Sequence, residues 1–257
     1  MPRLPCGRLG ALLATVALGL GACATAPDRL PPEAGARLRP EDAAALVRRW
    51  DAAWQAFPGL RATVDLTVRR GGRTERAAAL LLLSPTHLRL EIATPFGLPA
   101  LVATGGPGGF TVFRPVERKA WTARPTADAV SRWLGVPMPP ELLPRLLAGQ
   151  VPPPTDPGAV RVGRDRGSPI TFERGALRVR AWPRSDGQPA RVLLENGERL
   201  LVDLEWAVNG ALQSVRLEAP GRAAEVLIRY VAGEYVSPPP EAFELILPAD
   251  IQVESAN

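Results

Sequence analysis

Short runs in which apolar and polar residues alternate constrain the fold of this 257-residue chain more than any other feature. Between residues 61 and 69 every second residue is apolar, and a second apolar run, 77–83, follows a Gly71-Gly72 turn. Similar short runs recur at 88–92, 177–180, 202–206, 226–230 and 243–247. Alternation with a period of two predicts strands that have one buried face and one wet face. Frequent glycine and proline turns between them favour a strongly curved antiparallel sheet.

One run near the start has helical spacing instead. Pro40 suits the first position of a helix, and Glu41 and Asp42 suit its first turn. The apolar residues then follow at helical intervals: Leu46, Val47, Trp50, Trp54 and Phe57. Because Pro58-Gly59 ends this run, we predict one amphipathic helix of about 18 residues.

The predicted sheet is interrupted once, by an apolar insert. Residues 126–134 and 141–147 read as two short helices that end at Gly135 and Gly149, with Pro144 in the first turn of the second. The insert is rich in large apolar side chains: Trp133, Leu134, Leu142, Leu143, Leu146 and Leu147. Such an insert must cover either the ordinary core or a hollow on the concave side of the sheet.

The N-terminus has the features of an export signal. Arginines at positions 3 and 8 precede an apolar stretch, 9–20, that is too short to span a bilayer. The following Leu20-Gly21-Ala22-Cys23 resembles the bacterial lipoprotein signal, which implies that residues 1–22 are removed and that Cys23 carries a covalent lipid. Ala24 is not the aspartate associated with inner-membrane retention, so an outer-membrane anchor is expected. We interpret residues 23–38 as the lipidated cysteine with a flexible tether, and 39–257 as a single domain facing the periplasm.

The composition excludes much chemistry. One histidine, His87, and two cysteines leave no zinc cluster, and no G-x-S-x-G or S-x-x-K motif is present. We therefore expect no catalytic residue, no metal and no cofactor other than the lipid on Cys23. All but one of the 31 basic residues are arginines, and the net charge is +5. Their spread over strand faces indicates solvated positions or, alternatively, a weak attraction to anionic lipids. Export argues against nucleic acid as a partner.

A turn near the middle of the sheet carries an unusual side chain. Thr94-Pro95-Phe96-Gly97 has proline second and glycine fourth, as in a type I turn. Phe96 then lies near the tip of a hairpin, followed by Leu98. Its ring either folds back onto the core or forms an exposed hydrophobic finger.

These motifs, in order, resemble the LolB family. They are Leu88-Arg89-Leu90, Thr94-Pro95-Phe96-Gly97, Leu134-Gly135-Val136-Pro137-Met138-Pro139 and Leu147-Ala148-Gly149. The family comprises outer-membrane lipoproteins that receive other lipoproteins from the periplasmic carrier LolA. The resemblance implies an incomplete antiparallel β-barrel with a helical lid over an apolar cavity. It also implies a membrane-insertion loop, which falls on Pro95, Phe96, Gly97 and Leu98.

From this resemblance we expect a monomeric, non-enzymatic α+β protein that takes the acyl chains of lipoprotein cargo from a LolA-like carrier. The cargo would pass to the inner leaflet of the outer membrane without nucleotide. Candidate cavity and lid residues are Trp50, Trp54, Trp133, Leu134, Leu142, Leu143, Leu146 and Leu147, and each could equally be core. The alternatives are an accessory envelope lipoprotein that binds a protein partner or another hydrophobic ligand, and a hydrolase, which would need a clustered acid–base pair.

Overall fold

The computed structural model describes residues 38–94, 96–134, 136–163, 165, 167–219 and 224–255. The N-terminal half contains α1 (Pro40–Ala56), β1 (Leu60–Arg70), β2 (Arg73–Leu83), β3 (Leu88–Ala93), β4 (Pro99–Gly106), β5 (Gly109–Arg114) and β6 (Lys119–Ala123). An insert follows with α2 (Ala127–Leu134), the 3₁₀ turn η1 (Pro140–Leu142), α3 (Leu143–Leu147) and η2 (Pro157–Ala159). The remaining elements are β7 (Arg161–Val162), β8 (Ile170–Arg174), β9 (Leu177–Pro183), β10 (Pro189–Asn196), β11 (Arg199–Trp206), β12 (Leu212–Ala219), β13 (Ala224–Tyr235), η4 (Pro240–Phe243) and β14 (Gln252–Ser255).

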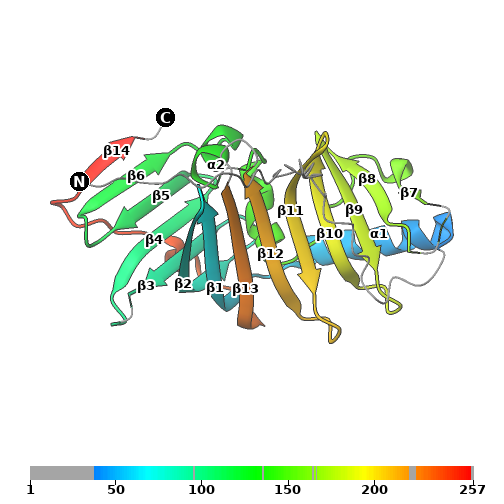
Figure 1. Cartoon of the computed structure of the whole chain (residues 1–257), viewed down its shortest axis with the longest axis horizontal. Coiled ribbons are helices and arrows are strands. Elements are labelled where there is room, and N and C mark those ends of the chain that lie inside the picture. The colour runs from blue at the N-terminus through cyan, green and yellow to red at the C-terminus, as the bar shows by residue number, and fades with distance from the viewer. Residues whose placement is uncertain are drawn as a thin grey trace, which may run out of the picture.

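The strands form one continuous sheet in the order β14-β6-β5-β4-β3-β2-β1-β13-β12-β11-β10-β9-β8-β7 (Figure 1). Neighbouring strands are antiparallel except β14, which pairs parallel with β6. The sheet curls but its two edges do not pair, and both edges are short strands, of four residues in β14 and two in β7. Short edge strands offer little unpaired backbone to other chains. The predicted incomplete β-barrel is therefore confirmed.

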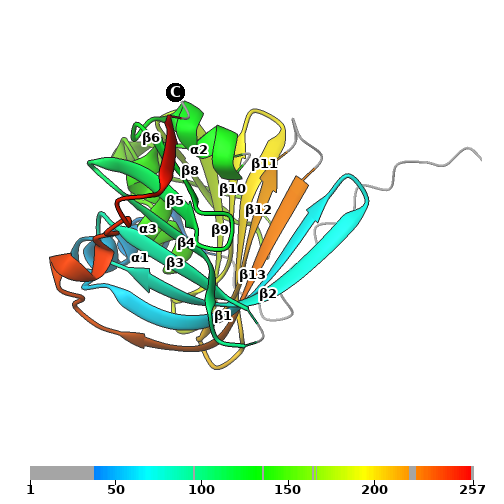
Figure 2. The same cartoon turned by 90° about the vertical axis from the view of Figure 1, so that its left-hand side faces the viewer.

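The predicted alternation decides which face of the sheet is covered. In β1, Leu60, Ala62 and Val64 are buried while the residues between them are exposed. The buried set faces the concave side, called here the inner face, and the opposite side is the outer face. The inner-face side chains of β1, β2 and β9–β12 belong to one hydrophobic core. Figure 2 shows the helices on the concave side of the curled sheet, where they complete this core.

Helix α1 packs against the inner face through one stripe of side chains. Ala43, Val47, Trp50 and Trp54 are buried, at intervals of three and four residues. Pro40 occupies the first turn together with Glu41 and Asp42, as the sequence predicts. The Trp50 indole Nε1 donates a hydrogen bond of 3.1 Å to the carbonyl of Gly187 in the β9–β10 turn. This bond attaches α1 to the turn between strands β9 and β10.

The sequence prediction of a two-helix insert is confirmed, whereas that of a last strand at 243–247 is not. The two-helix insert is present, and Pro144 lies in the first turn of α3, where its missing N–H costs no hydrogen bond. The predicted strand at 243–247 is wrong. The prolines at 238–240 lead into the 3₁₀ turn η4, and the carbonyl of Glu244 accepts a hydrogen bond from the Arg89 side chain instead of a neighbouring strand. The last strand is β14, further along the chain.

Gly59, between α1 and β1, lies in close contact with the backbone of two neighbouring segments, and this contact can be tested by substitution. Its φ is +141°, and an added Cβ would lie 2.5 Å from the Leu83 carbonyl oxygen and 2.6 Å from that of Val236. Because backbone atoms cannot move aside, we expect Gly59→Ala to lower the free energy of unfolding by about 3 kcal/mol. In the control Gly108→Ala an added Cβ meets no atom within 4 Å, so a change below about 0.5 kcal/mol is expected. Urea unfolding would measure both, and equal effects would contradict this explanation.

Candidate functional site

The predicted lid residues come together on the inner face of the sheet. Leu142, Leu143, Leu146 and Leu147 of η1 and α3 are all buried, and they share one hydrophobic cluster with Trp50 and Trp54 of α1. Residues 127–149 are called the lid below. Trp133 and Leu134 belong to the last turn of α2, and their side chains lie outside the described part of the structure.

Arg145 attaches the lid to two other elements. Its Nε donates to the carbonyl of Pro85, between β2 and β3, at 3.3 Å, and its Nη1 donates to the carbonyl of Trp54. The guanidinium carbon also lies 5.1 Å from the centre of the Trp54 ring, in cation–π range. Burial lowers the pKa of Arg145 from its ordinary value. Sequence reasoning missed this residue, although a single arginine among the leucines of α3 was a signal for it.

Tyr230 makes a further attachment to α3. This β13 side chain projects from the inner face, and its hydroxyl donates a hydrogen bond to the carbonyl of Leu147, at the end of α3. Burial raises the pKa of Tyr230 above its ordinary value, because the phenolate would lose its hydration there. Arg145 thus ties the middle of α3 to α1 and to the β2–β3 connection, and Tyr230 ties its last residue to β13.

A small pocket remains between the lid and strands β3, β4 and β5. Its volume is about 200 Å³. Its lining is mostly apolar and includes Leu88, Phe110, Pro125, Pro140 and Pro144. Ligand pockets usually measure roughly 300–1,000 Å³. This pocket is below that range, and the side chains of α1, α3 and the strands pack into one core over the inner face. A ligand larger than this pocket could enter there only if the lid moved.

The β3–β4 connection forms an exposed hydrophobic finger, defined as residues 94–98. The turn is closed by a hydrogen bond of 2.9 Å from the Gly97 N–H to the Thr94 carbonyl, and Gly97 has a φ of +77°. Phe96 is 90% exposed and Leu98 is 65% exposed, while Pro95 lies outside the described residues. Of the two possibilities for Phe96, the structure has the exposed one. Two large apolar side chains together at a protruding turn suggest a contact surface.

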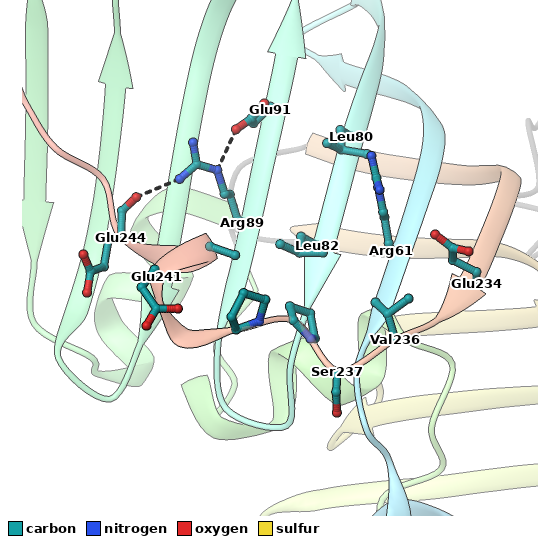
Figure 3. A pocket seen from close by; sticks show the side chains of 13 residues that line it. Arg61, Leu80, Leu82, Arg89, Glu91, Glu234, Val236, Ser237, Glu241 and Glu244 are labelled. Atoms are coloured by element: carbon teal, nitrogen blue, oxygen red, sulfur yellow. Dashed lines mark hydrogen bonds and ion pairs between the residues drawn. The ribbon is translucent and has the colours of Figure 1, made fainter.

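A second hollow lies on the outer face of the sheet, over β1, β2 and β3 (Figure 3). This outer groove has a volume of about 660 Å³ and is bordered by the segment 236–244. Leu80 and Leu82 form part of its lining, and both come from the unbroken apolar run of β2. Sequence reasoning missed the groove. The signal was that run itself, because a strand without polar alternation is covered on both faces.

Charged side chains surround the leucines of the outer groove. Arg89 pairs with Glu91 at 2.6 Å and donates to the Glu244 carbonyl at 2.8 Å, as Figure 3 shows. Arg61, Glu234 and Glu241 also line the groove. The mixture of paired charges and leucines resembles a protein contact surface more than an acyl-chain site.

No site is located by the other features that the sequence raised, which are His87, metal ligands, a membrane span and Cys23. His87 packs its ring 5.4 Å from that of Phe243, and its Nδ1 lies 2.9 Å from the Thr86 hydroxyl. Within the described residues, no group of three or more His, Cys, Asp or Glu side chains could hold a metal ion. In the same part of the chain, no helix is long and apolar enough to cross a bilayer. Cys23 lies outside the described residues.

Comparison with protein families gave no match, and comparison with curated proteins gave none either. Among solved structures, the chain is similar to a DUF1329 family protein from Desulfovibrio piger, with 14% identity, a TM-score of 0.49, and 79% of this chain and 96% of that chain covered. It is similar to a Vibrio parahaemolyticus domain provisionally assigned to outer-membrane lipoprotein sorting, with 9% identity, a TM-score of 0.49 and 79% and 95% covered. It is also similar to a LolA-superfamily protein from Nitrosomonas europaea, with 13% identity, a TM-score of 0.49 and 79% and 97% covered. At these values no shared function follows, and the function has to be inferred from the chain's own residues.

Tyr230 makes the lid attachment testable by pH. Because its pKa is raised in the folded state, the unfolded chain loses the phenolic proton first as pH rises above about 10. Stability should therefore be unaffected below pH 10 and should fall above it, by up to about 1.4 kcal/mol per pH unit. We expect Tyr230→Phe to cost about 1 kcal/mol at neutral pH and to remove most of that alkaline loss. Urea unfolding at neutral and alkaline pH measures both.

Tyr235 supplies the comparison. Burial also raises the pKa of Tyr235, but the residue is 66% exposed, so its share of the alkaline loss should be the smaller one. Tyr235→Phe should keep most of the alkaline loss of the parent protein. If Tyr230→Phe keeps the full alkaline loss as well, Tyr230 is not the buried phenol that this explanation requires.

Proposed function

We propose that this chain is a non-enzymatic envelope lipoprotein that accepts the acyl chains of other lipoproteins beneath its lid and inserts them into the outer membrane. The single observation that carries the proposal is the finger, in which Phe96 and Leu98 are held in water by a closed turn. Burying each in a bilayer would stabilise the contact by about 2 kcal/mol. A protein that did not meet an apolar surface would gain nothing from this exposure.

In the proposed binding step, the ligand displaces the lid side chains from the inner face of the sheet. Leu142, Leu146 and Trp54 pack together over the inner face. An entering acyl chain would take over their contacts as α3 moves outward, and the bonds made by Arg145 and Tyr230 would restore the closed state after release. About ten CH₂ groups sheltered in this way contribute about 8 kcal/mol, which corresponds to micromolar binding. Binding of that strength permits release to a bilayer without nucleotide.

Anchorage and partners complete the proposal. The lipid on Cys23 would hold the domain at the inner leaflet of the outer membrane, on the periplasmic side, through the tether. A periplasmic LolA-like carrier would supply the acylated cargo, and one copy of the chain would suffice. The main support for this part is the signal and lipidation motif at residues 20–23.

A second candidate function is favoured by a specific observation. The inner face is packed, and the larger hollow is the outer groove, with its leucines and charged rim. An accessory envelope lipoprotein that binds a protein partner in this groove would have these features. Substitution of Leu80 by Asp should abolish capture of such a partner, whereas the acyl-chain function predicts normal cargo delivery by that variant.

Substitution at the finger tests the proposed function. Phe96→Glu places a charge at the tip without touching the core, so cargo binding should be unchanged while transfer of cargo into liposomes falls about tenfold or more. The control is Val208→Glu in the β11–β12 turn, where the side chain is 73% exposed at the opposite strand ends. Normal transfer by Phe96→Glu, or equal loss in both variants, would refute the role of the finger.

A further inference from the structure

The β1–β2 hairpin carries a concentration of arginines that the proposed function does not use. Its tip, residues 68–76, reads Val-Arg-Arg-Gly-Gly-Arg-Thr-Glu-Arg. All four arginines of this arginine hairpin are exposed. Arg69 pairs with Glu225 at 3.2 Å. Arg70, Arg73 and Arg76 form no ion pair with any residue that the structure describes.

The hairpin extends well past its neighbour β3. Pairing between β2 and β3 ends at Ala79 opposite Ile92, whereas pairing between β1 and β2 continues to Arg70 opposite Arg73. Residues 73–78 of β2 therefore have no partner in β3, over a length of roughly 20 Å. Figure 2 shows this hairpin in cyan. Its β2 strand has no second neighbour on the turn side of Ala79, while its β1 strand stays paired with β13 as far as Arg70 opposite Ala224.

Arg70 and Arg73 lie opposite each other in the last register pair before the turn, and Arg76 lies on the other face of the hairpin. All three are exposed near the tip, so a surface that meets the tip end-on can reach them.

The direction of the strands places the arginine hairpin and the finger at the same end of the sheet. β2 runs antiparallel to both β1 and β3, so the end of β1 and the end of β3 lie at the same edge. The β1–β2 turn and the β3–β4 turn with Phe96 both leave from that edge. One end of the domain therefore combines exposed cations with exposed apolar side chains, as membrane-surface proteins do.

We propose that the arginine hairpin is a docking site for the anionic headgroups of a phospholipid bilayer. The guanidinium groups are exposed to water. A single small anion at this hairpin would therefore stay hydrated and would be held only weakly. A bilayer offers many phosphates at once, and its surface potential contributes about fivefold in affinity for each arginine near it. The inference rests on the proposed function only in assuming that this domain meets a membrane.

The test measures docking of the anchored full-length protein to a second membrane. The protein is reconstituted into phosphatidylcholine vesicles fixed on beads, and fluorescent acceptor vesicles with or without phosphatidylglycerol are added without cargo. We expect capture of the phosphatidylglycerol vesicles only, weakening as salt is raised. Arg70→Gln, Arg73→Gln and Arg76→Gln combined should reduce that capture at least about tenfold.

The matched control removes the same charge elsewhere. Arg48, Arg124 and Arg161 are exposed, form no ion pair among the described residues, and lie in α1, after β6 and in β7. Their combined replacement by Gln should leave capture nearly unchanged. Equal loss in both triple variants would show that net charge alone acts, and would overturn the proposal. Unchanged capture by the hairpin variant would also overturn it, as would full competition by inorganic phosphate at matched ionic strength. Because no cargo is present, these outcomes are independent of the cargo-transfer test at Phe96.

Discussion

The packing of the lid against the inner face of an unclosed sheet is the contact on which the rest of this structure depends. A curled sheet whose edges do not pair leaves an apolar concave surface that the chain itself must cover. The elements α1, η1 and α3 cover it, with Trp50, Trp54, Leu142 and Leu146. Among the described residues, the side-chain hydrogen bonds that hold α3 in place come from Arg145 and Tyr230. A cover of apolar side chains held by a few hydrogen bonds can exchange its contacts for those of another apolar chain at moderate cost.

Strand direction then determines what the domain presents to its surroundings. Because successive strands are antiparallel, alternate turns lie at the same edge, and the turns at that edge include the finger and the arginine hairpin. The side chains there are apolar at Phe96 and Leu98 and cationic at Arg70 and Arg73. We infer that binding and delivery are separated in space, with the ligand on the concave side and the membrane contact at one edge.

Local patterns predicted much of this fold, and long-range contacts account for what they missed. Helix α1, the alternating strands, the two-helix insert and the 94–97 turn follow from periodicity, proline and glycine, which act over a few residues. The strand predicted at 243–247 is absent because the prolines at 238–240 lead into η4, and the Glu244 carbonyl that follows accepts a hydrogen bond from Arg89, far away in sequence. The parallel pairing of β14, the groove beside 236–244 and the attachment of Arg145 to Trp54 also join segments that no local pattern connects.

Photochemical crosslinking tests the central claim, that acyl chains bind beneath the lid, most directly. A lipoprotein acyl chain with a photoreactive group at its terminal carbon would be bound to the protein, irradiated, and the modified residues located by peptide mass spectrometry. The account predicts modification of α1 near Trp54 and of the lid near Leu146. Modification confined to Leu80, Leu82 and the segment 236–244 of the outer groove, or no specific modification, would contradict it.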